Sequence, residues 1–382
     1  MAPRILDVSL DTLRRERTSI KWRRYPADVL PLWIAEMDAR PCPAVVEAVT
    51  AAMTRGDTGY AGDEGYAASL AQLAEAEWGW APDAGAMVRV TDVLTGIAHL
   101  MRLLTDPGGP VIVSPPVYNA FYEVIASVGR QVVEAPLTAD GRLDLDVLDT
   151  TFRDVTAGGQ RAAYLLCNPH NPTGTVHTPD ELEGLARVAS GHGVRVLSDE
   201  IHAPLVFATS RFTPFLTVPG SEGGITVTSA SKAWNLAGLK AALVVPGDDA
   251  RADVARLHPF VTFGASHFGV IAQTAAFREG REWVRDLVGE LDANRVLLAE
   301  LVGQHLPGAR LLLPESTYLA WLDLRPLGLG DRPAARLLER GRLAVSDGPI
   351  FGTGGAGHVR VNFATSPDIL REAVARIASS VD

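Results

Sequence analysis

Short apolar runs alternate with amphipathic helical stretches along most of this chain, and this alternation is the feature that most restricts its fold. Residues 111–113 and 131–135 form two of the apolar runs, and helical patterns follow from Leu145 and from the capping box at Thr178. Strands that alternate with helices predict a mostly parallel sheet with helices on both faces. The sequence therefore predicts an α/β fold.

The pattern changes toward the C-terminus. A long helical stretch covers about residues 282–305, and the residues after it have an α+β texture. A chain of 382 residues has the volume for one large domain and a smaller one. We expect a large domain of residues 40–275, and a small domain formed by residues 1–39 together with residues 276–382.

The charge balance excludes several classes of protein. A formal net charge of -10 and a pI near 5.4 leave no basic stripe for phosphates, so we expect no nucleic-acid partner. No apolar run approaches the length of a membrane span, and the first residues lack the apolar region of a signal peptide. We therefore expect a cytoplasmic protein without membrane contacts. Cys42 and Cys167 are too few for a disulfide framework or a zinc cluster, and we expect no metal.

Lys232 stands in the stretch TVTSASKAWNLAGLK, directly after an apolar run. The chain has only three lysines, Lys21, Lys232 and Lys240, and two of them lie in this stretch. A lysine amine can deprotonate and form an imine, whereas a guanidinium group stays charged. The stretch is therefore either a strand end that delivers a reactive amine or an ordinary surface lysine after a strand.

Polar residues follow other apolar runs as well. The turn at residues 95–97 opens a helix, so the amides of Gly96 and Ile97 are a natural seat for an anion. Tyr118 follows a strand, at the edge where open α/β sheets bind ligands. Asn171 lies in the rigid loop CNPHNPTG. Each feature also has a structural interpretation, because every helix start has free amides and such a loop is often only a turn.

The strand VRVLSDEIH delivers Asp199 and Glu200 at its C-terminal end. A carboxylate in this position costs desolvation energy unless it has a cationic partner, which favours a functional role. His202 follows, and is either part of the site or a hydrogen-bonded loop histidine. Tyr60 lies in a Gly-rich loop, where packing is the commoner role, and Arg360 lies on a strand after a second Gly-rich segment.

Together, these strand ends match the needs of pyridoxal phosphate. This cofactor requires a lysine for its aldehyde, a carboxylate for its ring nitrogen, a donor for its phenolic oxygen and a phosphate cradle. The order of the motifs NPTG, DEIH and SASK resembles that in the fold-type I pyridoxal phosphate enzymes of the aspartate aminotransferase superfamily. The resemblance covers nearly the whole chain. It implies a mostly parallel seven-stranded sheet in the large domain and a smaller α+β domain.

Six segments resemble one branch of that superfamily, the MalY/PatB branch of cystathionine β-lyases and other cysteine-conjugate C–S lyases. They are LPLWIAEMDARPCPAVVEAV, the region from GY to GY at residues 59–66, CNPHNPTG, SDEIHAPL, SASKAWNLAGLK and FGTGGAGHVRVNFA. Two departures are visible. Glu36 replaces the usual Asp of a W-x-A-D-M-D motif, and Ala203-Pro204 replaces the usual residues after DEIH. Both lie near the expected site and are compatible with an altered substrate.

The resemblance implies a role for each residue around the cofactor ring. Lys232 binds the aldehyde of pyridoxal phosphate and then moves the Cα proton of the substrate. Asp199 pairs with the ring nitrogen, and Tyr118 stacks on the ring. Asn171 donates to the phenolic oxygen, with assistance from His202.

The resemblance also implies a phosphate cradle and a substrate clamp. The cradle consists of the Gly96 and Ile97 amides, Ser229, Lys240, and Tyr60 reaching over from a partner subunit. Arg360 clamps the α-carboxylate of an amino-acid substrate, a bidentate task that suits a guanidinium group, and Trp33 contributes to the substrate site. A homodimer with shared active sites follows from this arrangement.

The function expected from the resemblance is α,β-elimination from cystathionine or another S-substituted L-cysteine, giving a thiol, pyruvate and ammonia. The alternative is an aminotransferase, or another pyridoxal phosphate reaction on an amino acid of specialised metabolism. The motifs do not separate these outcomes, because both use the same lysine, aspartate and arginine. A regulator built on this fold would carry a DNA-binding module first, and we expect none because the core motifs begin by Trp33.

Overall fold

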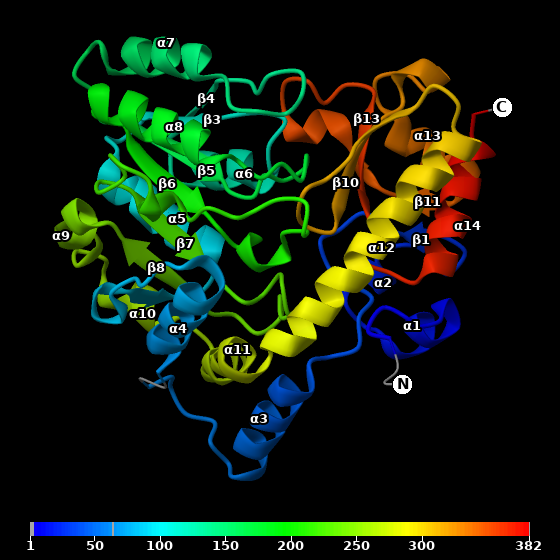
Figure 1. Ribbon diagram of the computed structural model, residues 1–382, viewed down its shortest axis with the longest axis horizontal. Coiled ribbons are helices and arrows are strands. Elements are labelled where there is room, and N and C mark those ends of the chain that lie inside the picture. The colour runs from blue at the N-terminus through cyan, green and yellow to red at the C-terminus, as the bar shows by residue number, and fades with distance from the viewer. Residues whose placement is uncertain (1–3, 63–64, 382) are drawn as a thin grey trace.

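A computed structural model describes residues 4–62 and 65–381 of the chain, and Figure 1 shows two unequal parts side by side. The larger part is built on a seven-stranded sheet that is covered by helices. The smaller part contains a four-stranded sheet and both ends of the described chain. The long helix α12 runs diagonally from one part to the other in Figure 1. The predicted α/β class is confirmed.

The seven-stranded sheet is mostly parallel, as predicted. Its strands, in spatial order, are β2 (Val88–Val90), β8 (Ala242–Pro246), β7 (Ile225–Thr228), β6 (Arg195–Asp199), β5 (Ala163–Cys167), β3 (Pro110–Val113) and β4 (Gln131–Glu134). Only β8 runs antiparallel to its neighbours. The carboxyl ends of the parallel strands therefore meet at one edge of the sheet, where α/β proteins bind their ligands.

Side chains on the central strands alternate between two separate cores, because successive strand residues point to opposite faces. On β5, Leu165 packs with the helices of one face, whereas Tyr164 and Leu166 pack with those of the other. The helices of the first face are α5 (Val93–Leu104), α6 (Ala120–Ser127), α9 (Arg251–Val254) and α10 (Pro259–Phe263). The second face is covered by α7 (Leu145–Thr156) and α8 (Pro179–Gly191). Both faces are buried, which explains the continuous apolar runs in the sequence.

The predicted capping box is present at the start of α8. The Thr178 side chain accepts a hydrogen bond from the Glu181 amide, and the Glu181 side chain accepts one from the Thr178 amide. Three further helices of the larger part are α3 (Pro43–Thr54), α4 (Tyr66–Trp78) and α11 (His267–Glu279). Short 3₁₀ turns are η1 (Ala84–Ala86), η2 (Ala203–Leu205), η3 (Phe215–Thr217), η4 (Asp248–Ala250), η5 (Arg325–Leu327) and η6 (Gly348–Phe351).

The smaller part has a four-stranded antiparallel sheet. Its sheet has the order β12 (Ser346–Asp347), β13 (His358–Asn362), β10 (Leu319–Asp323) and β9 (Arg310–Leu312), and β1 (Leu30–Pro31) pairs separately with β11 (Leu343–Ala344). Its helices are α1 (Leu10–Glu16), α2 (Ile20–Arg23), α12 (Arg281–His305), α13 (Pro333–Gly341) and α14 (Pro367–Ala378). These strands and helices come from both ends of the sequence. The division at residues 40 and 275 stays a prediction.

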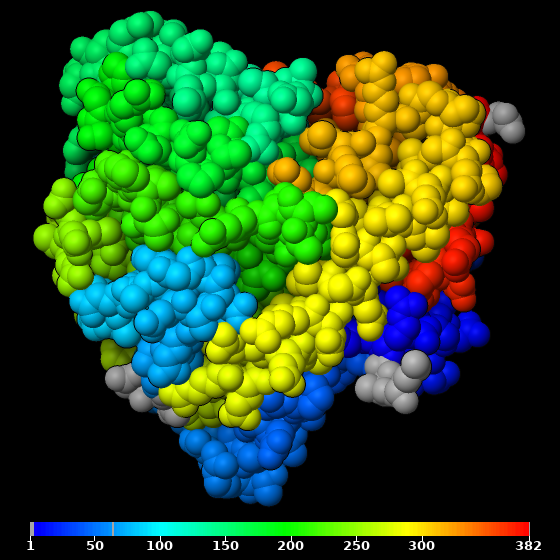
Figure 2. Space-filling model, in the orientation of Figure 1, coloured from blue at the N-terminus to red at the C-terminus, as the bar shows by residue number. Residues whose placement is uncertain are grey.

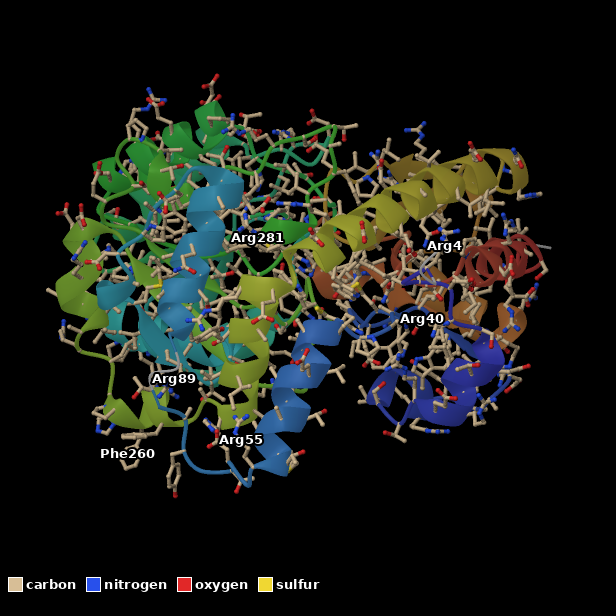
Figure 3. The ribbon with its side chains drawn as sticks, turned by 60° about the horizontal axis from the view of Figure 1, so that its bottom comes forward. Arg4, Arg40, Arg55, Arg89, Phe260 and Arg281 are labelled. Carbon is tan, nitrogen blue, oxygen red and sulfur yellow. The ribbon has the colours of Figure 1, made fainter. Side chains whose placement is uncertain are left out.

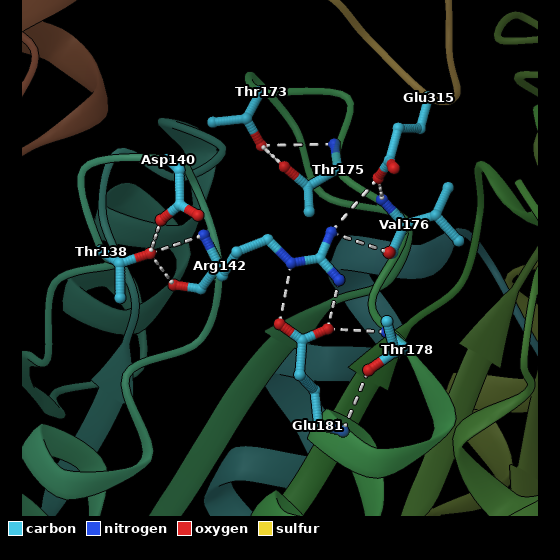
Figure 4. Close-up of polar contacts among 9 residues, drawn as sticks. All are labelled: Thr138, Asp140, Arg142, Thr173, Thr175, Val176, Thr178, Glu181 and Glu315. Carbon is cyan, nitrogen blue, oxygen red and sulfur yellow. Dashed lines mark hydrogen bonds and ion pairs between the residues drawn. The ribbon is translucent and has the colours of Figure 1, made fainter.

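Arg142 links the two parts on one side of the molecule, as Figure 4 shows. Its guanidinium group pairs with both carboxylate oxygens of Glu181 in the larger part, and donates to Glu315 Oε2 at 3.3 Å just before β10. Glu315 also accepts the Val176 amide at 2.8 Å. A charge-assisted bidentate pair of this kind fixes orientation as well as distance.

Among the described residues, no helix has the length and apolar character needed to cross a membrane.

Candidate active site

A cavity of about 270 Å³ lies at the carboxyl edge of the seven-stranded sheet. It is lined by six of the residues predicted for the site: Tyr118, Asn171, Asp199, His202, Lys232 and Lys240. They come from four different strand ends and the loops that follow them, so the parallel sheet brings them together. The structure therefore places these six residues around one cavity.

Lys232 lies four residues beyond the end of β7, with its amine inside the cavity. Its Nζ donates a hydrogen bond to the Ala35 carbonyl at 3.0 Å. Among the described residues it forms no ion pair within 4.0 Å. Burial and the nearby charge of Arg360 lower the pKa of Lys232 to about 8, and the charge of Asp199 opposes this shift. About a tenth of this amine is therefore unprotonated at pH 7, far more than for a lysine of ordinary pKa, and the unprotonated form is the one that a nucleophile or base requires.

Asp199 is the last residue of β6 and is 4% exposed. Burial raises the pKa of its carboxyl group to about 7, against the opposing effects of the Ile201 amide and the Lys232 charge. The Ile201 amide donates to Asp199 Oδ1 at 3.1 Å, and no cation pairs with this carboxylate among the described residues. A buried carboxylate in this state gains energy from a cationic donor that enters the cavity.

His202 lies beside Asp199 as a neutral ring. Burial, with the charges of Lys232 and Arg360, lowers the pKa of His202 to about 3. Its ring packs edge to face against Tyr318 at 6.0 Å, and its Nδ1 atom is buried without a hydrogen-bond partner in the described chain. The ring can therefore accept or donate one further hydrogen bond without carrying charge.

Arg360 and Asn171 connect the two parts of the molecule at the site. Arg360 Nη1 donates to Asn171 Oδ1 at 3.0 Å, which leaves the Asn171 amide nitrogen free to donate elsewhere. Nη2 of Arg360 donates to the Trp33 carbonyl and to Ser346 Oγ, both at 3.2 Å. Arg360 is 4% exposed, and no carboxylate pairs with it among residues 4–62 and 65–381. Burial lowers its pKa to about 10, so it remains cationic and suits an anionic ligand.

The loop that carries Phe351 supports Arg360. The guanidinium carbon of Arg360 lies 4.9 Å from the centre of the Phe351 ring. This loop is attached to the larger part at Glu134, which accepts hydrogen bonds from the Thr353 hydroxyl and, at 2.6 Å, from the Tyr122 hydroxyl. Gly352 between them has φ of 89°, and a Cβ there would meet the Tyr122 oxygen. A residue with a side chain would therefore push this loop away.

The predicted anion seat is wrong in its position. Helix α5 begins at Val93 and not at the 95–97 turn, because Asp92 caps it by accepting the Thr95 amide at 2.8 Å. Gly96 already donates its amide to the Asp92 carbonyl at 2.9 Å, and the Ile97 side chain is fully buried in the core. The residues that line the cavity are Val93, Leu94 and Thr95, so the predicted range of 95–97 lies two residues too late.

Of two other residues predicted to contact the phosphate, Lys240 lines the cavity and Ser229 does not. Lys240 lines the cavity and pairs with Asp92 at 2.8 Å, at the start of α5. Ser229 is buried away from the cavity lining, where its hydroxyl is bonded to the Ala241 carbonyl at 2.8 Å and to Gln273. Ser231 lines the cavity in its place. Ser231 was not among the predicted residues, and the hydrogen bond of Ser229 to Gln273 is one of the contacts that hold Ser229 out of the cavity lining.

Tyr60 and Trp33 lie outside the cavity lining. Tyr60 is 91% exposed, so it makes no contact with its own cavity. Trp33 contributes its backbone carbonyl to Arg360, while its indole ring packs edge to face against Tyr25 at 6.0 Å. The sequence did not single out Ala35 or Tyr318. Tyr318 donates its hydroxyl to the Ala35 carbonyl at 3.1 Å, the same atom that binds Lys232.

The two sequence departures lie on different sides of the site. The Glu36 carboxylate accepts the Ser19 hydroxyl at 2.5 Å, and its backbone carbonyl accepts Lys21 Nζ at 3.0 Å. Lys21 is fully buried and pairs with Asp38 at 2.8 Å. Glu36 is therefore held by the N-terminal segment and does not line the cavity. Ala203 and Pro204 form the turn η2, behind the cavity rather than in it.

These features fit pyridoxal phosphate. The cavity offers an amine of lowered pKa, a buried carboxylate without a cation, a free amide donor, and a cationic lysine at a helix start. They match the aldehyde, the ring nitrogen, the phenolic oxygen and the phosphate of that cofactor. Fold and site together define a scaffold of the pyridoxal phosphate type.

Comparison with known proteins gives the family. The model of the aminotransferase class I and II family matches residues 27–377, and the chain belongs to this family. A Mycobacterium tuberculosis protein named as a candidate cystathionine beta-lyase is 50% identical, over 98% of this chain and 97% of its own length. The cystathionine beta-lyase of Corynebacterium glutamicum is 35% identical, over 97% and 98% of the two chains.

The fold has a close match among solved structures. A crystal structure of a candidate PLP-dependent beta-cystathionase from Corynebacterium diphtheriae has a TM-score of 0.91 at 34% identity, and covers 99% of both chains. The predicted relationship to fold-type I enzymes and to the C–S lyase branch is thereby confirmed.

Proposed function

We propose that this protein is a pyridoxal-phosphate-dependent carbon–sulfur lyase that acts on cystathionine or another S-substituted L-cysteine. The observation that carries the proposal is a cavity lined by Lys232, an amine of lowered pKa, and by Asn171, whose Oδ1 binds the buried guanidinium group of Arg360 at 3.0 Å. The full-length identity to proteins named as cystathionine beta-lyases supports the same reaction.

Lys232, Asp199, Asn171 and Tyr118 would hold the cofactor. When bound, pyridoxal phosphate supplies an electron sink for the pair of electrons left at Cα. Asp199, which burial keeps near its protonation point, holds the proton on the ring nitrogen. The backbone amides at the start of α5 and Lys240 bind the phosphate dianion, because both are positive donors.

Arg360 binds the α-carboxylate of the substrate and fixes its orientation. Lys232 then removes the Cα proton, a role that needs a free amine close to neutral pH. The bond between Cβ and sulfur breaks, and the thiolate leaves with the electron pair and takes up a proton. The three-carbon remainder takes up water and yields pyruvate and ammonia. No oxidant or reductant is required.

The alternative is an aminotransferase, which would use the same Lys232, Asp199 and Arg360. A protein named as an arginine–pyruvate transaminase is also similar, at 27% identity. Incubation of the pure enzyme with cystathionine, without any 2-oxo acid, separates the two. A lyase releases a thiol and pyruvate in equal amounts. Turnover only after addition of a 2-oxo acid would identify the aminotransferase and contradict the lyase.

We also infer a homodimer in which each site is completed by the other subunit. Tyr60 and Phe260 are 91% and 81% exposed, which is unusual for large aromatic rings. Figure 3 shows Phe260 and Arg55 on the same lower side of the molecule. Mixing inactive Lys232→Ala with Tyr60→Ala chains tests this arrangement. A shared site predicts activity in the mixed dimer above either parent, whereas no recovery in a verified mixed dimer contradicts it.

A further inference from the structure

A second cavity, of about 350 Å³, lies beside the active site. It is enclosed by the end of α4, the loop of residues 203–212 and the first turns of α12. Figure 2 shows these three segments meeting on the face toward the viewer, α4 in light blue, the loop in green and α12 in yellow. Its volume is in the range that suits a small organic ligand.

The floor of the second cavity is apolar and firmly packed. Phe207 and Trp234 are each 1% exposed, and Phe212 packs edge to face on Trp78 at 5.1 Å. Trp234 Nε1 donates to the Gly280 carbonyl at 2.9 Å, which fixes the indole ring. Such a floor favours an apolar body and gives no partner to a fully polar ligand.

The rim of the second cavity is cationic. It carries Arg211, Arg281 and Arg285 against the single carboxylate of Glu77, so three positive charges minus one negative charge leave a surplus of two. Arg281 and Arg285 both donate to the same oxygen of Glu77, at 2.7 and 2.8 Å. Arg211 has no hydrogen bond or ion pair in the described chain. This local surplus contrasts with the net charge of -10 of the whole chain.

We propose that the second cavity binds a small organic carboxylate with an apolar body, such as an arylalkanoate. The apolar floor takes the body, and the guanidinium groups of Arg211 and Arg285 take the carboxylate at the mouth. A cationic ligand is disfavoured by the charge surplus, and a long polyanion by the size of the cavity. The proposal concerns binding alone and does not depend on which reaction the active site performs.

The second cavity and the active site share two walls, which gives an occupant a route to affect turnover. His202 lines the active site, and the next residues, Ala203 and Pro204, line the second cavity. Lys232 and Trp234 are related in the same way, two residues apart on one turn. Ala203 and Pro204, which depart from the family pattern, thus lie between the two cavities.

The test uses 3-phenylpropanoate as the probe and calorimetric titration of the holoenzyme. Because Arg360 also attracts carboxylates, all variants are made in an Arg360→Ala background. We expect the probe to bind this background, and the neutral 3-phenylpropanamide to bind at least about tenfold more weakly, as loss of a charge-assisted hydrogen bond predicts.

The matched variants decide the outcome. Arg211→Gln with Arg285→Gln should weaken probe binding by at least about tenfold, whereas Arg187→Gln, an exposed arginine on α8, should leave it unchanged. Arg211 and Arg285 are both exposed, so the thermal midpoint should be kept, and it is measured for each variant. The proposal is overturned if the Arg360→Ala holoenzyme binds no probe, or if the rim variant binds it as tightly as the control.

Discussion

The active site has two walls that are built in different ways. The proposed cofactor wall, formed by Asn171, Asp199 and Lys232, comes from the ends of strands in one sheet and from the loops that directly follow them. The proposed substrate wall consists of Arg360, the Phe351 loop and the backbone carbonyls of Trp33 and Ala35, which are far apart in the sequence. One wall thus depends on the register of one sheet, and the other on the docking of separate segments.

The two walls also differ in charge. Burial brings the pKa values of Asp199 and Lys232 to about 7 and about 8, so both groups exchange protons readily near neutral pH. Arg360 is equally buried, but its pKa of about 10 keeps it cationic throughout that range. The cofactor wall can therefore move protons, whereas the substrate wall can only hold an anion. This contrast leads to four predictions of decreasing size.

Asp199→Ala should have the largest effect. The substitution removes the group that holds the proton of the cofactor ring nitrogen, so we expect kcat to fall by roughly 10³-fold, as for loss of a buried stabilising group. The measurement is kcat of the cofactor-saturated variant. The exposed control Asp154→Ala should keep its activity. A variant that keeps more than about a tenth of kcat would show that the ring proton does not depend on Asp199.

Arg360→Ala should act on the other wall. Removal of one partner of a buried charge pair costs about 2–5 kcal/mol, so we expect kcat/KM to fall about 10²-fold, mainly through KM. The lysine-bound cofactor should still form, because Arg360 does not line the cavity that contains Lys232. Arg187→Ala is the matched control. An unchanged KM would place the carboxylate clamp elsewhere.

The pH dependence of the rate at which the protein binds pyridoxal phosphate tests the lowered pKa of Lys232 in the cofactor wall. Only unprotonated Lys232 attacks the aldehyde, so the capture rate of the cofactor-free protein should rise about tenfold per pH unit below the pKa. Since burial lowers that pKa to about 8, the rate should level off above pH 8. The rise would continue to above pH 10 if the amine were unperturbed. Rapid mixing with pyridoxal phosphate at a series of pH values distinguishes the two curves.

Thr353→Val should have the smallest effect. It removes the hydroxyl that attaches the Phe351 loop to Glu134 while keeping the size of the side chain. Loss of one such hydrogen bond costs about 1 kcal/mol, so we expect KM to rise several-fold with kcat nearly unchanged. Thr156→Val on α7, whose hydroxyl bonds only within its helix, is the control. If the two variants have the same KM, the attachment of the Phe351 loop to Glu134 does not help Arg360 to bind the substrate carboxylate.

The cofactor wall was largely predictable from the sequence. One apolar strand ends at Asp199, and another ends shortly before Lys232. Both residues must lie at the same edge of the sheet, because parallel strands align their carboxyl ends. The exact start of a helix was not predictable in the same way. The sequence predicts a helix start at residues 95–97, but α5 begins at Val93 because the Asp92 side chain caps it. Whether an aspartate caps a helix depends on the backbone conformation around it, which the sequence alone does not show.

The substrate wall was predictable only in part. The resemblance gave Arg360, but the support from Phe351 and the anchor at Glu134 depend on how two sheets dock. Ser229 shows the same limit, since Gln273 on a distant helix decides which serine of S-x-S-K faces the cavity. Contacts between segments far apart in the chain carry no local signal in the sequence.

The most direct measurement concerns Lys232, because the account makes it the group that moves the Cα proton. L-Alanine has no leaving group, so its Cα–H exchange in D₂O, followed by NMR, reports this proton transfer without elimination. We expect exchange in the wild type and in Lys240→Ala loaded with saturating cofactor. In Lys232→Ala, we expect no exchange and no visible absorption band of lysine-bound pyridoxal phosphate. Exchange at the wild-type rate in Lys232→Ala would contradict the account.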